Sequence, residues 1–242
     1  MRALIAAVSI ACWLSACAPI STAPAVAPSV VPSGFPAANY LAAAARAEPV
    51  FRLDAERSLV VIRVYRAGAL ARFGHDHVVA SRDVRGYVLL SSAAGARRVD
   101  VYAPLASLSV DEPALRAQAG FDTQPSQQDV EGTRRNMLEK VLEADQYPFV
   151  SIHIDRVAGE SPAITVDAAV TLHGITRTLP LAVELEIPSA QTIYARGRFS
   201  AKLTDFSITP YSLLGGALRV EDRLDIEFEI AATRVSADAI LN

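Results

Sequence analysis

Four segments in the second half of the chain alternate between apolar and polar side chains. Their apolar positions are Ile164, Val166, Ala168, Val170 and Leu172; Leu179, Leu181, Val183, Leu185 and Ile187; Ala195, Gly197, Phe199, Ala201 and Leu203; and Leu224, Ile226, Phe228 and Ile230. Successive side chains of a strand point to opposite faces, so each segment predicts a strand with one buried face. Weaker alternation predicts further strands over 51–53, 59–65, 78–90, 99–105 and 149–157.

One segment has helical spacing instead. Val130, Met137, Leu138, Val141 and Leu142 fall on one helix face, and the segment follows Ser126 and Asp129, which are spaced as a capping box. Pro148 ends this segment and begins the next predicted strand. A wet face opposite a buried face is typical of antiparallel sheets. The pattern therefore predicts an all-β protein, an antiparallel β-barrel with one inserted amphipathic helix, because closure removes exposed strand edges. A two-sheet sandwich is the alternative.

The N-terminus has the pattern of a bacterial lipoprotein signal. Arg2 precedes an apolar run over 3–13, and the residues Leu14-Ser15-Ala16-Cys17 follow. This run is too short to cross a hydrocarbon core of about 30 Å, but it suits a secretory signal. We expect cleavage before Cys17 and lipidation of that cysteine. Ordinary secretory cleavage at the Ala16-Cys17-Ala18 triplet is the alternative, but it would leave Pro19 just after the scissile bond.

The predicted domains follow from this signal. Residues 1–16 form the signal peptide, 17–48 a lipidated N-terminus and tether rich in proline and alanine, and 49–242 the barrel domain. Proline-rich chain reaches about 3.1 Å per residue, so the tether holds the domain away from the bilayer. A short helix is expected over 39–47. Because Ala18 and not aspartate follows the cysteine, resemblance to enterobacterial sorting favours the outer membrane, on its periplasmic side.

Composition excludes several classes of function. A net charge of −3 over 242 residues provides no basic field for nucleic acid. Only Cys12 and Cys17 are cysteines, and Cys12 leaves with the signal, so no disulfide framework is available. The chain contains no nucleophile elbow, P-loop, zinc-protease helix motif or dinucleotide fingerprint. We therefore expect a protein that is not an enzyme.

Five segments, taken together and in order, resemble the YceI-like family of lipocalin-like periplasmic proteins that bind polyisoprenoids. They are Phe51-Arg52-Leu53-Asp54, Leu142-Glu143-Ala144-Asp145-Gln146-Tyr147-Pro148-Phe149, Val170-Thr171-Leu172-His173-Gly174-Ile175-Thr176, Leu203-Thr204-Asp205-Phe206-Ser207-Ile208 and Val220-Glu221-Asp222-Arg223-Leu224-Asp225-Ile226. The resemblance implies an eight-stranded antiparallel barrel whose apolar lumen holds a long amphiphile, such as an isoprenoid quinone. It implies ligand contacts from apolar-phase residues of the strands: Val170, Val183, Phe199, Ile226 and Phe228.

The sequence Gly74-His75-Asp76-His77 departs most from this family. In an extended strand His75 and His77 share a face and Asp76 takes the other. The imidazoles could make structural hydrogen bonds, recognise a ligand head group or bind metal. Two donors fall short of the three or four that zinc sites use, and no spacing shows that His153 or His173 meets them, so no metal site is expected, with His75 and His77 as the candidates.

Two other histidines receive simpler interpretations. His173, in the segment Leu172-His173-Gly174-Ile175-Thr176, is expected to be a hydrogen-bonded structural residue of a turn. His153 shares a face with Ser151 and Asp155 and is expected to face solvent.

The sequence thus predicts a lipid-anchored periplasmic protein that carries or binds a polyisoprenoid, isoprenoid quinone or similar long-chain amphiphile without catalysis. Its partners would be that lipid, the bacterial membrane and, as an open alternative, a second copy in a homodimer. No cofactor is expected apart from a bound isoprenoid lipid or quinone. Two other functions remain open: a metal- or quinone-dependent redox partner that uses His75 and His77, and a structural or interaction module of the envelope whose barrel is filled by its own side chains.

Overall fold

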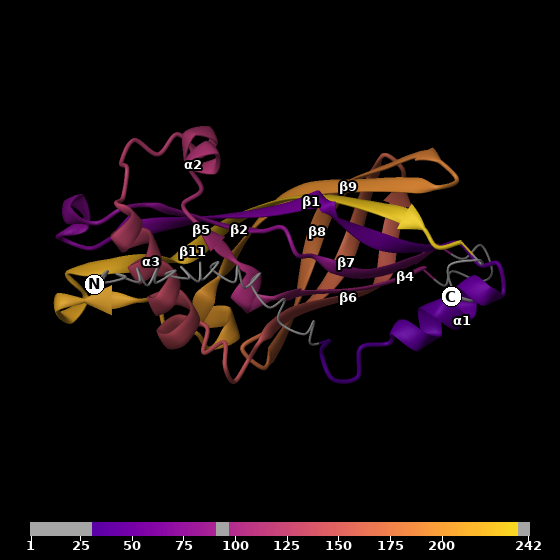
Figure 1. The fold of residues 1–242 in the computed structure, drawn as a ribbon, viewed down its shortest axis with the longest axis horizontal. Helices are drawn as coiled ribbons and strands as arrows, with labels where there is room; N and C mark the ends of the chain where they lie inside the picture. The colour runs from indigo at the N-terminus through magenta and orange to yellow at the C-terminus, as the bar shows by residue number, and fades with distance from the viewer. Residues whose placement is uncertain (1–30, 91–96, 237–242) are drawn as a thin grey trace, which may run out of the picture. The chain divides into compact units, whose positions relative to one another are not determined.

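The computed structural model describes residues 31–90 and 97–236, and most of them lie in antiparallel strands (Figure 1). The strands are β1 (Val50–Ala67), β2 (His77–Ser81), β3 (Arg85–Leu90), β4 (Arg97–Pro104), β5 (Ser109–Val110), β6 (Phe149–Glu160), β7 (Ala163–Leu172), β8 (Ile175–Ser189), β9 (Thr192–Lys202), β10 (Ser212–Leu213) and β11 (Leu218–Arg234). The predicted signal peptide, Cys17 and the tether up to residue 30 lie outside the described residues.

The sheet closes on itself, which confirms the predicted antiparallel barrel. Its strands follow the order β11-β9-β8-β7-β6-β4-β3-β1, and β1 pairs again with β11. Among the described residues these eight strands form the barrel wall. The short strands β2 and β5 continue the sheet beyond the second half of β1, and β10 pairs with the start of β11.

Local sequence explains how neighbouring strands connect. Between β7 and β8 only His173 and Gly174 turn the chain, with positive φ angles of 52° and 72°. Two consecutive positive φ angles define the type I′ turn, whose twist matches that of a hairpin. Glycine takes such an angle without strain, and histidine is among the side chains that tolerate it. The turn joins ten paired positions of β7 and β8 in one unbroken register.

Two strand predictions were wrong in their boundaries. Residues 51–53 and 59–65 were expected to form separate strands, but both belong to β1, whose register shifts between Asp54 and Leu59. Residues 78–90 were expected to form one strand, but the chain turns between β2 and β3 at Arg82, Asp83 and Val84. The turn is needed because β3 pairs with the first residues of β1 whereas β2 pairs with residues beyond the shift.

Within residues 31–90 and 97–236, three α-helices accompany the barrel. They are α1 (Ala37–Ala45), α2 (Pro113–Ala119) and α3 (Gln127–Asn136), and α3 continues into the π-helix η3 (Met137–Val141). Ser126 and Asp129 form the predicted capping box, in which each side chain bonds the other residue's backbone N–H. The pattern of apolar residues did not reveal α2. None of the helices that the structure describes has the length and apolar character needed to span a membrane.

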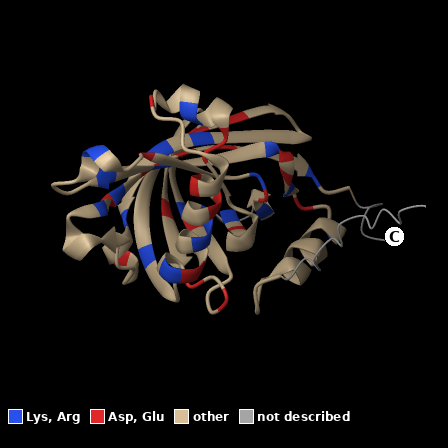
Figure 2. Cartoon of the chain, turned by 60° about the vertical axis from the view of Figure 1, so that its left-hand side comes forward, with Lys and Arg blue, Asp and Glu red and all other residues tan. Residues whose placement is uncertain are grey.

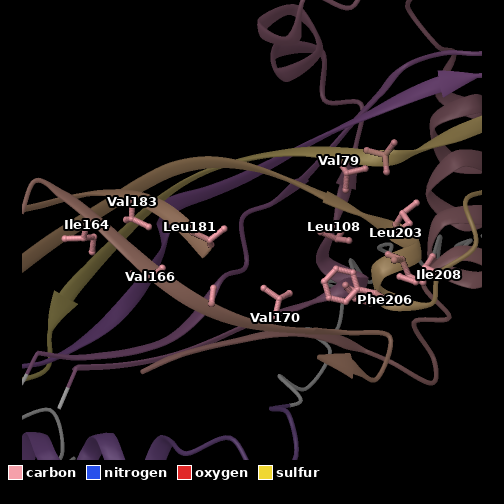
Figure 3. Packing of buried hydrophobic residues seen from close by; sticks show 14 residues of the cluster. Val79, Leu108, Ile164, Val166, Val170, Leu181, Val183, Leu203, Phe206 and Ile208 are labelled. Carbon is pink, nitrogen blue, oxygen red and sulfur yellow. The ribbon is translucent and has the colours of Figure 1, made fainter. Parts of the chain in front are cut away.

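The barrel separates an interior core from two smaller outer clusters. Most of the interior is one cluster of buried side chains from β7, β8 and the segments that cover one end, and Figure 3 shows them pointing between the strands. A second cluster around Phe51, Leu53 and Ala232 fills the other end. Outside the wall, α1 packs through Tyr40 against Val50, and α2 packs against β2. Acidic and basic residues are interspersed over the strands and do not gather into one field (Figure 2).

Candidate functional site

The predicted ligand contacts from β7 and β8 lie in the barrel interior. Val170 and Val183 are both buried members of the main interior cluster, and Figure 3 shows their side chains directed between the strands. Val170 is followed by the partly buried Thr171 and Val183 by the exposed Glu184, and these polar side chains take the opposite face. The period-two pattern therefore oriented this wall correctly. This wall of the barrel is closely packed.

The adjoining wall, formed by β9 and β11, contributes Phe199, Ile226 and Phe228. Phe199 lies directly across from Ile226 on the neighbouring strand, and its ring centroid is 6.5 Å from that of Phe228. Phe228 faces Gly197, where an added Cβ would lie 2.7 Å from the Phe228 ring. Gly197 thus makes space for this ring. The three predicted residues form one continuous apolar surface over β9 and β11.

This second wall differs from the first in its exposure. Phe199, Ile226 and Phe228 all remain partly accessible to water, although they point inward from a closed sheet. Ile62 and Val64, which face the same side from β1, are also only partly buried. An inward side chain keeps accessible surface where the interior beside it is not filled or where the barrel opens to solvent. The exposure therefore indicates space in the barrel beside this wall.

His77 lies on the inner side of the sheet, near one end of this wall. It pairs with Val64 of β1, and residues directly opposite one another in an antiparallel pair share a face. Val79, two residues further along β2, belongs to the main interior cluster. The His75 ring lies edge-on to the His77 ring with the centroids 6.2 Å apart. The structure thus brings the two predicted histidines together.

A buried aspartate holds His77. Its Nδ1 lies 2.6 Å from Oδ2 of Asp111, whose side chain has no exposed surface. Oδ1 of Asp111 accepts hydrogen bonds from the Arg116 guanidinium at 2.6 Å and from the Val78 backbone N–H at 3.0 Å. Burial raises the pKa of Asp111, but hydrogen bonds from His77, Val78 and Arg116 outweigh it and hold the pKa below its usual value. Asp111 is therefore a carboxylate at neutral pH.

Arg116 extends this network to the chain on either side. It donates to the backbone oxygens of Asp76 and Thr123, and only 6% of its side chain is exposed. Asp76 in turn accepts from the backbone N–H of Arg66 at 2.9 Å. The Gly74-His75-Asp76-His77 segment is thus fixed from both sides, and its geometry is set by residues distant in sequence.

This geometry restricts what His77 can do. A carboxylate only accepts hydrogen bonds, so Nδ1 of His77 is the donor and carries a proton. In the neutral ring Nε2 is then an acceptor, and a ligand hydroxyl suits it better than a carbonyl. Among the described residues no side chain bonds Nε2. The described residues also contain no group of three or more His, Cys, Asp or Glu side chains arranged to hold a metal ion.

The other two histidines lie away from this site. His153 is on the outer face, 40% exposed, with Nδ1 2.8 Å from Asp100, a carboxylate that also accepts from Tyr40 and Arg98. Burial raises the pKa of Asp100, but these hydrogen bonds outweigh it and lower that pKa. His173 sits in its turn with Nε2 3.2 Å from Glu143 and its ring centroid 4.3 Å from that of Tyr147.

A polar cleft of about 510 Å³ lies on the outer face of β1 and β11. Its lining includes Tyr65, Arg66, Asp76, Arg223 and Asp225. Arg66 contacts Asp76 and Arg223 contacts Asp225, whereas Arg72 and Glu221, which also line the cleft, form no ion pair with another described residue. The cleft has no apolar surface comparable to the barrel interior, so it does not suit a long hydrocarbon.

Sequence reasoning did not identify Asp111 and Arg116. Asp111 contacts His77 across 34 residues, and no spacing in the sequence indicates that contact. The segment Asp111-Glu112-Pro113 carries one usable signal, because acidic residues before a proline are typical of a helix start. That signal would have predicted α2, but not the partner of its buried arginine.

Comparison with known proteins identifies the fold independently. The sequence model described as "YceI-like domain" matches residues 51–232. Among solved structures, a polyisoprenoid binding domain from Saccharophagus degradans implicated in plant cell wall breakdown has a TM-score of 0.54 and 14% identity, over 78% of this chain and 99% of that one. BcnA from Burkholderia cenocepacia has a TM-score of 0.54 and 16% identity, over 75% of this chain and 99% of that one. No curated protein sequence matches the chain.

Proposed function

Because this chain belongs to the YceI-like family, we propose that its barrel binds a long-chain amphiphile, a polyisoprenoid or an isoprenoid quinone, without transforming it chemically. The observation that carries the proposal is the incompletely filled apolar wall formed by Phe199, Ile226 and Phe228. The similar domain from Saccharophagus degradans is a polyisoprenoid binding domain, which supports the same ligand class. An apolar lumen with few polar groups suits a hydrocarbon chain.

The lipid bilayer competes with the barrel for the ligand, and this limits how tightly such a protein binds it. Burial of apolar carbon from water yields about 25 cal/mol per Å². A polyisoprenoid in a cell starts in a bilayer, however, which is already apolar. The barrel therefore gains little over the membrane, and exchange stays near balance. This favours transient holding and transfer over storage.

His77 provides the polar end of the proposed site. Its Nε2 accepts a hydrogen bond, so a ligand with a terminal hydroxyl, such as a polyprenol or a hydroquinone, suits it. His75 lies close enough for its ring to contribute a second contact. With the apolar chain along β9 and β11 and the hydroxyl at His77, one amphiphile uses both parts of the site.

We further propose that the protein acts on the periplasmic side of the envelope as a lipoprotein. The signal before Cys17 supports this, and the residue that follows it favours the outer membrane. Several acyl chains hold a protein on a membrane, whereas one chain holds it only marginally. A tether keeps the barrel close to lipid-bearing surface and thereby raises the local concentration of ligand.

A chain-length series tests the barrel site. Phe199→Trp adds volume to the inner wall, so it should reduce affinity for long isoprenoid quinones more than for short ones that share the head group. Overpacking also costs about 1–3 kcal/mol of stability, so melting curves accompany the titrations. Ser200→Trp is the matched control, because Ser200 is exposed and directly follows Phe199 on the same strand. Equal loss of long and short ligands in both variants would place binding outside the lumen.

A further inference from the structure

Exposed large apolar side chains concentrate on two loops at one end of the barrel. Phe73, Leu213 and Leu214 are 65%, 47% and 74% exposed. Phe73 ends the 3₁₀ turn η1 (Ala71–Phe73), and the leucines lie in β10 and the turn η5 (Leu214–Gly216). In Figure 1 both loops lie at the left-hand end, and α1 lies at the opposite end. We call this surface of residues 68–74 and 211–219 the apolar tip.

The apolar tip is a built structure. The backbone N–H of Leu70 donates to the Ala217 oxygen at 2.8 Å, which joins the two loops. Gly68 allows this approach, since a Cβ there would lie 2.4 Å from the same oxygen. Within the second loop the Val220 N–H donates to Tyr211 at 2.9 Å. The three exposed side chains are therefore held on one fixed framework.

Folding does not account for the leucine that is most exposed. Leu214 has a φ of +52°, a conformation that is strained for a bulky side chain and that glycine or asparagine adopts at lower cost. Its side chain buries little surface in return. A leucine at this position thus neither favours the backbone conformation nor buries much apolar surface. Its apolar side chain remains available to a partner.

The charges on the apolar tip indicate which partner. Residues 68–74 and 211–219 contain no acidic side chain, and their charges are Arg72 and Arg219. Both arginines are exposed, and neither forms an ion pair with another of the residues that the structure describes. Apolar side chains rimmed by arginine match a bilayer surface with anionic lipid head groups.

We propose that the apolar tip docks onto an anionic lipid bilayer, with Phe73, Leu213 and Leu214 entering the head-group region. The tip lies where the end of β1 pairs with the start of β11. Val64 and Leu224, a few residues inside these strands, face the barrel interior. Docking therefore brings the interior close to the membrane that contains the ligand. This contact uses residues of the barrel domain alone and needs no acyl chain.

Tryptophan reporters in the full chain test insertion. In a Trp13→Phe, Cys17→Ser background, which removes the native tryptophan and the acylation site, Phe73→Trp and Leu214→Trp each place one reporter on the tip. Ile187→Trp is the matched control, since Ile187 is also 47% exposed but lies toward the opposite end of the barrel. The probe is vesicles of phosphatidylethanolamine and phosphatidylglycerol with brominated acyl chains. Both tip reporters should shift to the blue and lose at least half of their emission, and the control should keep its emission.

Three results would overturn the proposal. Quenching of the control to the same extent would mean that the tip has no special role. Unchanged emission at both tip positions would exclude insertion. A blue shift that depends on protein concentration without vesicles would assign the tip to contact between copies of the chain. None of these outcomes bears on the proposed lumen site, whose ligand titrations use detergent-free protein without vesicles.

A charge variant separates lipid recognition from plain hydrophobicity. In the Cys17→Ser background, Arg72→Gln with Arg219→Gln should reduce co-sedimentation with the anionic vesicles at least fivefold at low salt and leave the weak binding to pure phosphatidylcholine unchanged. Arg52→Gln, an exposed arginine near α1, is the control. If the double variant binds both vesicle types as the unchanged protein does, the arginines do not recognise the anionic surface and the proposal fails.

Discussion

Asp111 is the residue on which the polar part of the site depends. It is fully buried and bonds both His77 and Arg116. Asp111→Asn removes the charge and retains a side chain that tolerates the positive φ of 56° at this position. Removal of one partner from a buried ion pair costs about 3–5 kcal/mol. We expect a loss in this range at neutral pH, measured by denaturant unfolding.

The same carboxylate makes stability depend on pH. The folded pKa of Asp111 is lowered, whereas an unfolded aspartate titrates near a pKa of about 3.9. Its contribution is therefore fully present above about pH 4 and is lost as the pH falls through the folded pKa. Between pH 5 and 2 the stability of Asp111→Asn should fall less than that of the unchanged protein. Glu184→Gln, at an ion pair whose side chains are about half exposed to solvent, should change the profile much less, and parallel profiles for all three proteins would contradict this assignment.

Each histidine can be tested by its effect on ligand affinity. His77→Ala removes the Nε2 acceptor and should weaken binding of a polyprenol about tenfold, since a hydrogen bond contributes about 0.5–1.5 kcal/mol net and an unsatisfied partner costs more. Binding of a hydrocarbon of equal length should scarcely change. His75→Ala, whose ring has no fixed carboxylate partner among the described contacts, should have a smaller effect. Equal losses for both ligands would mean that His77 only holds the fold.

At the residue scale, the sequence predicted which face of a strand a side chain occupies better than it predicted contacts between side chains. Phe199 and Phe228 point inward because alternation determines the face of a strand side chain. The bond between His77 and Asp111 depends on where β2 and the loop before α2 meet, which no local pattern encodes. For the same reason the sequence did not show that Nδ1 of His77 is already engaged by Asp111 and that only Nε2 is free for a ligand.

At the element scale, long alternating segments were predictable and their interruptions were not. β7, β8, β9 and β11 follow the predicted apolar phases because one face of each is buried along its length. The sequence pattern did not indicate the turn between β2 and β3, because Val84 within it is itself buried and apolar. Strand pairing with the two halves of β1 decides that turn, and pairing is a property of the whole sheet.

Two substitutions at helix α3 should change the stability of the protein in opposite directions. Ser126→Ala removes the capping box of α3 and should cost about 1 kcal/mol. Gly132→Ala should stabilise by about 0.5–1 kcal/mol, because a Cβ there meets no atom within 4 Å and alanine favours helix. Thermal melts should show shifts in opposite directions. A fall in melting temperature for Gly132→Ala would contradict a regular helix at this position.

At the scale of the whole molecule, anchor and barrel are predicted to be independent. Cys17→Ser removes the acylation site without touching the barrel domain. We expect this variant to leave the membrane fraction after a high-salt wash and to melt at the same temperature as the unchanged protein. High salt is required because it weakens contacts of Arg72 and Arg219 with lipid head groups. Sedimentation with membranes after that wash would refute the lipoprotein assignment.

If the barrel binds a polyisoprenoid or isoprenoid quinone, it should contain that lipid in the cell. Native mass spectrometry of protein purified from its source membrane measures this directly. We expect an added mass equal to one polyisoprenoid or isoprenoid quinone, lost on mild activation and reduced in the Phe199→Trp protein. A stoichiometric metal would support a redox partner that uses His75 and His77. A bare chain in every preparation would contradict lipid binding and leave a barrel filled by its own side chains.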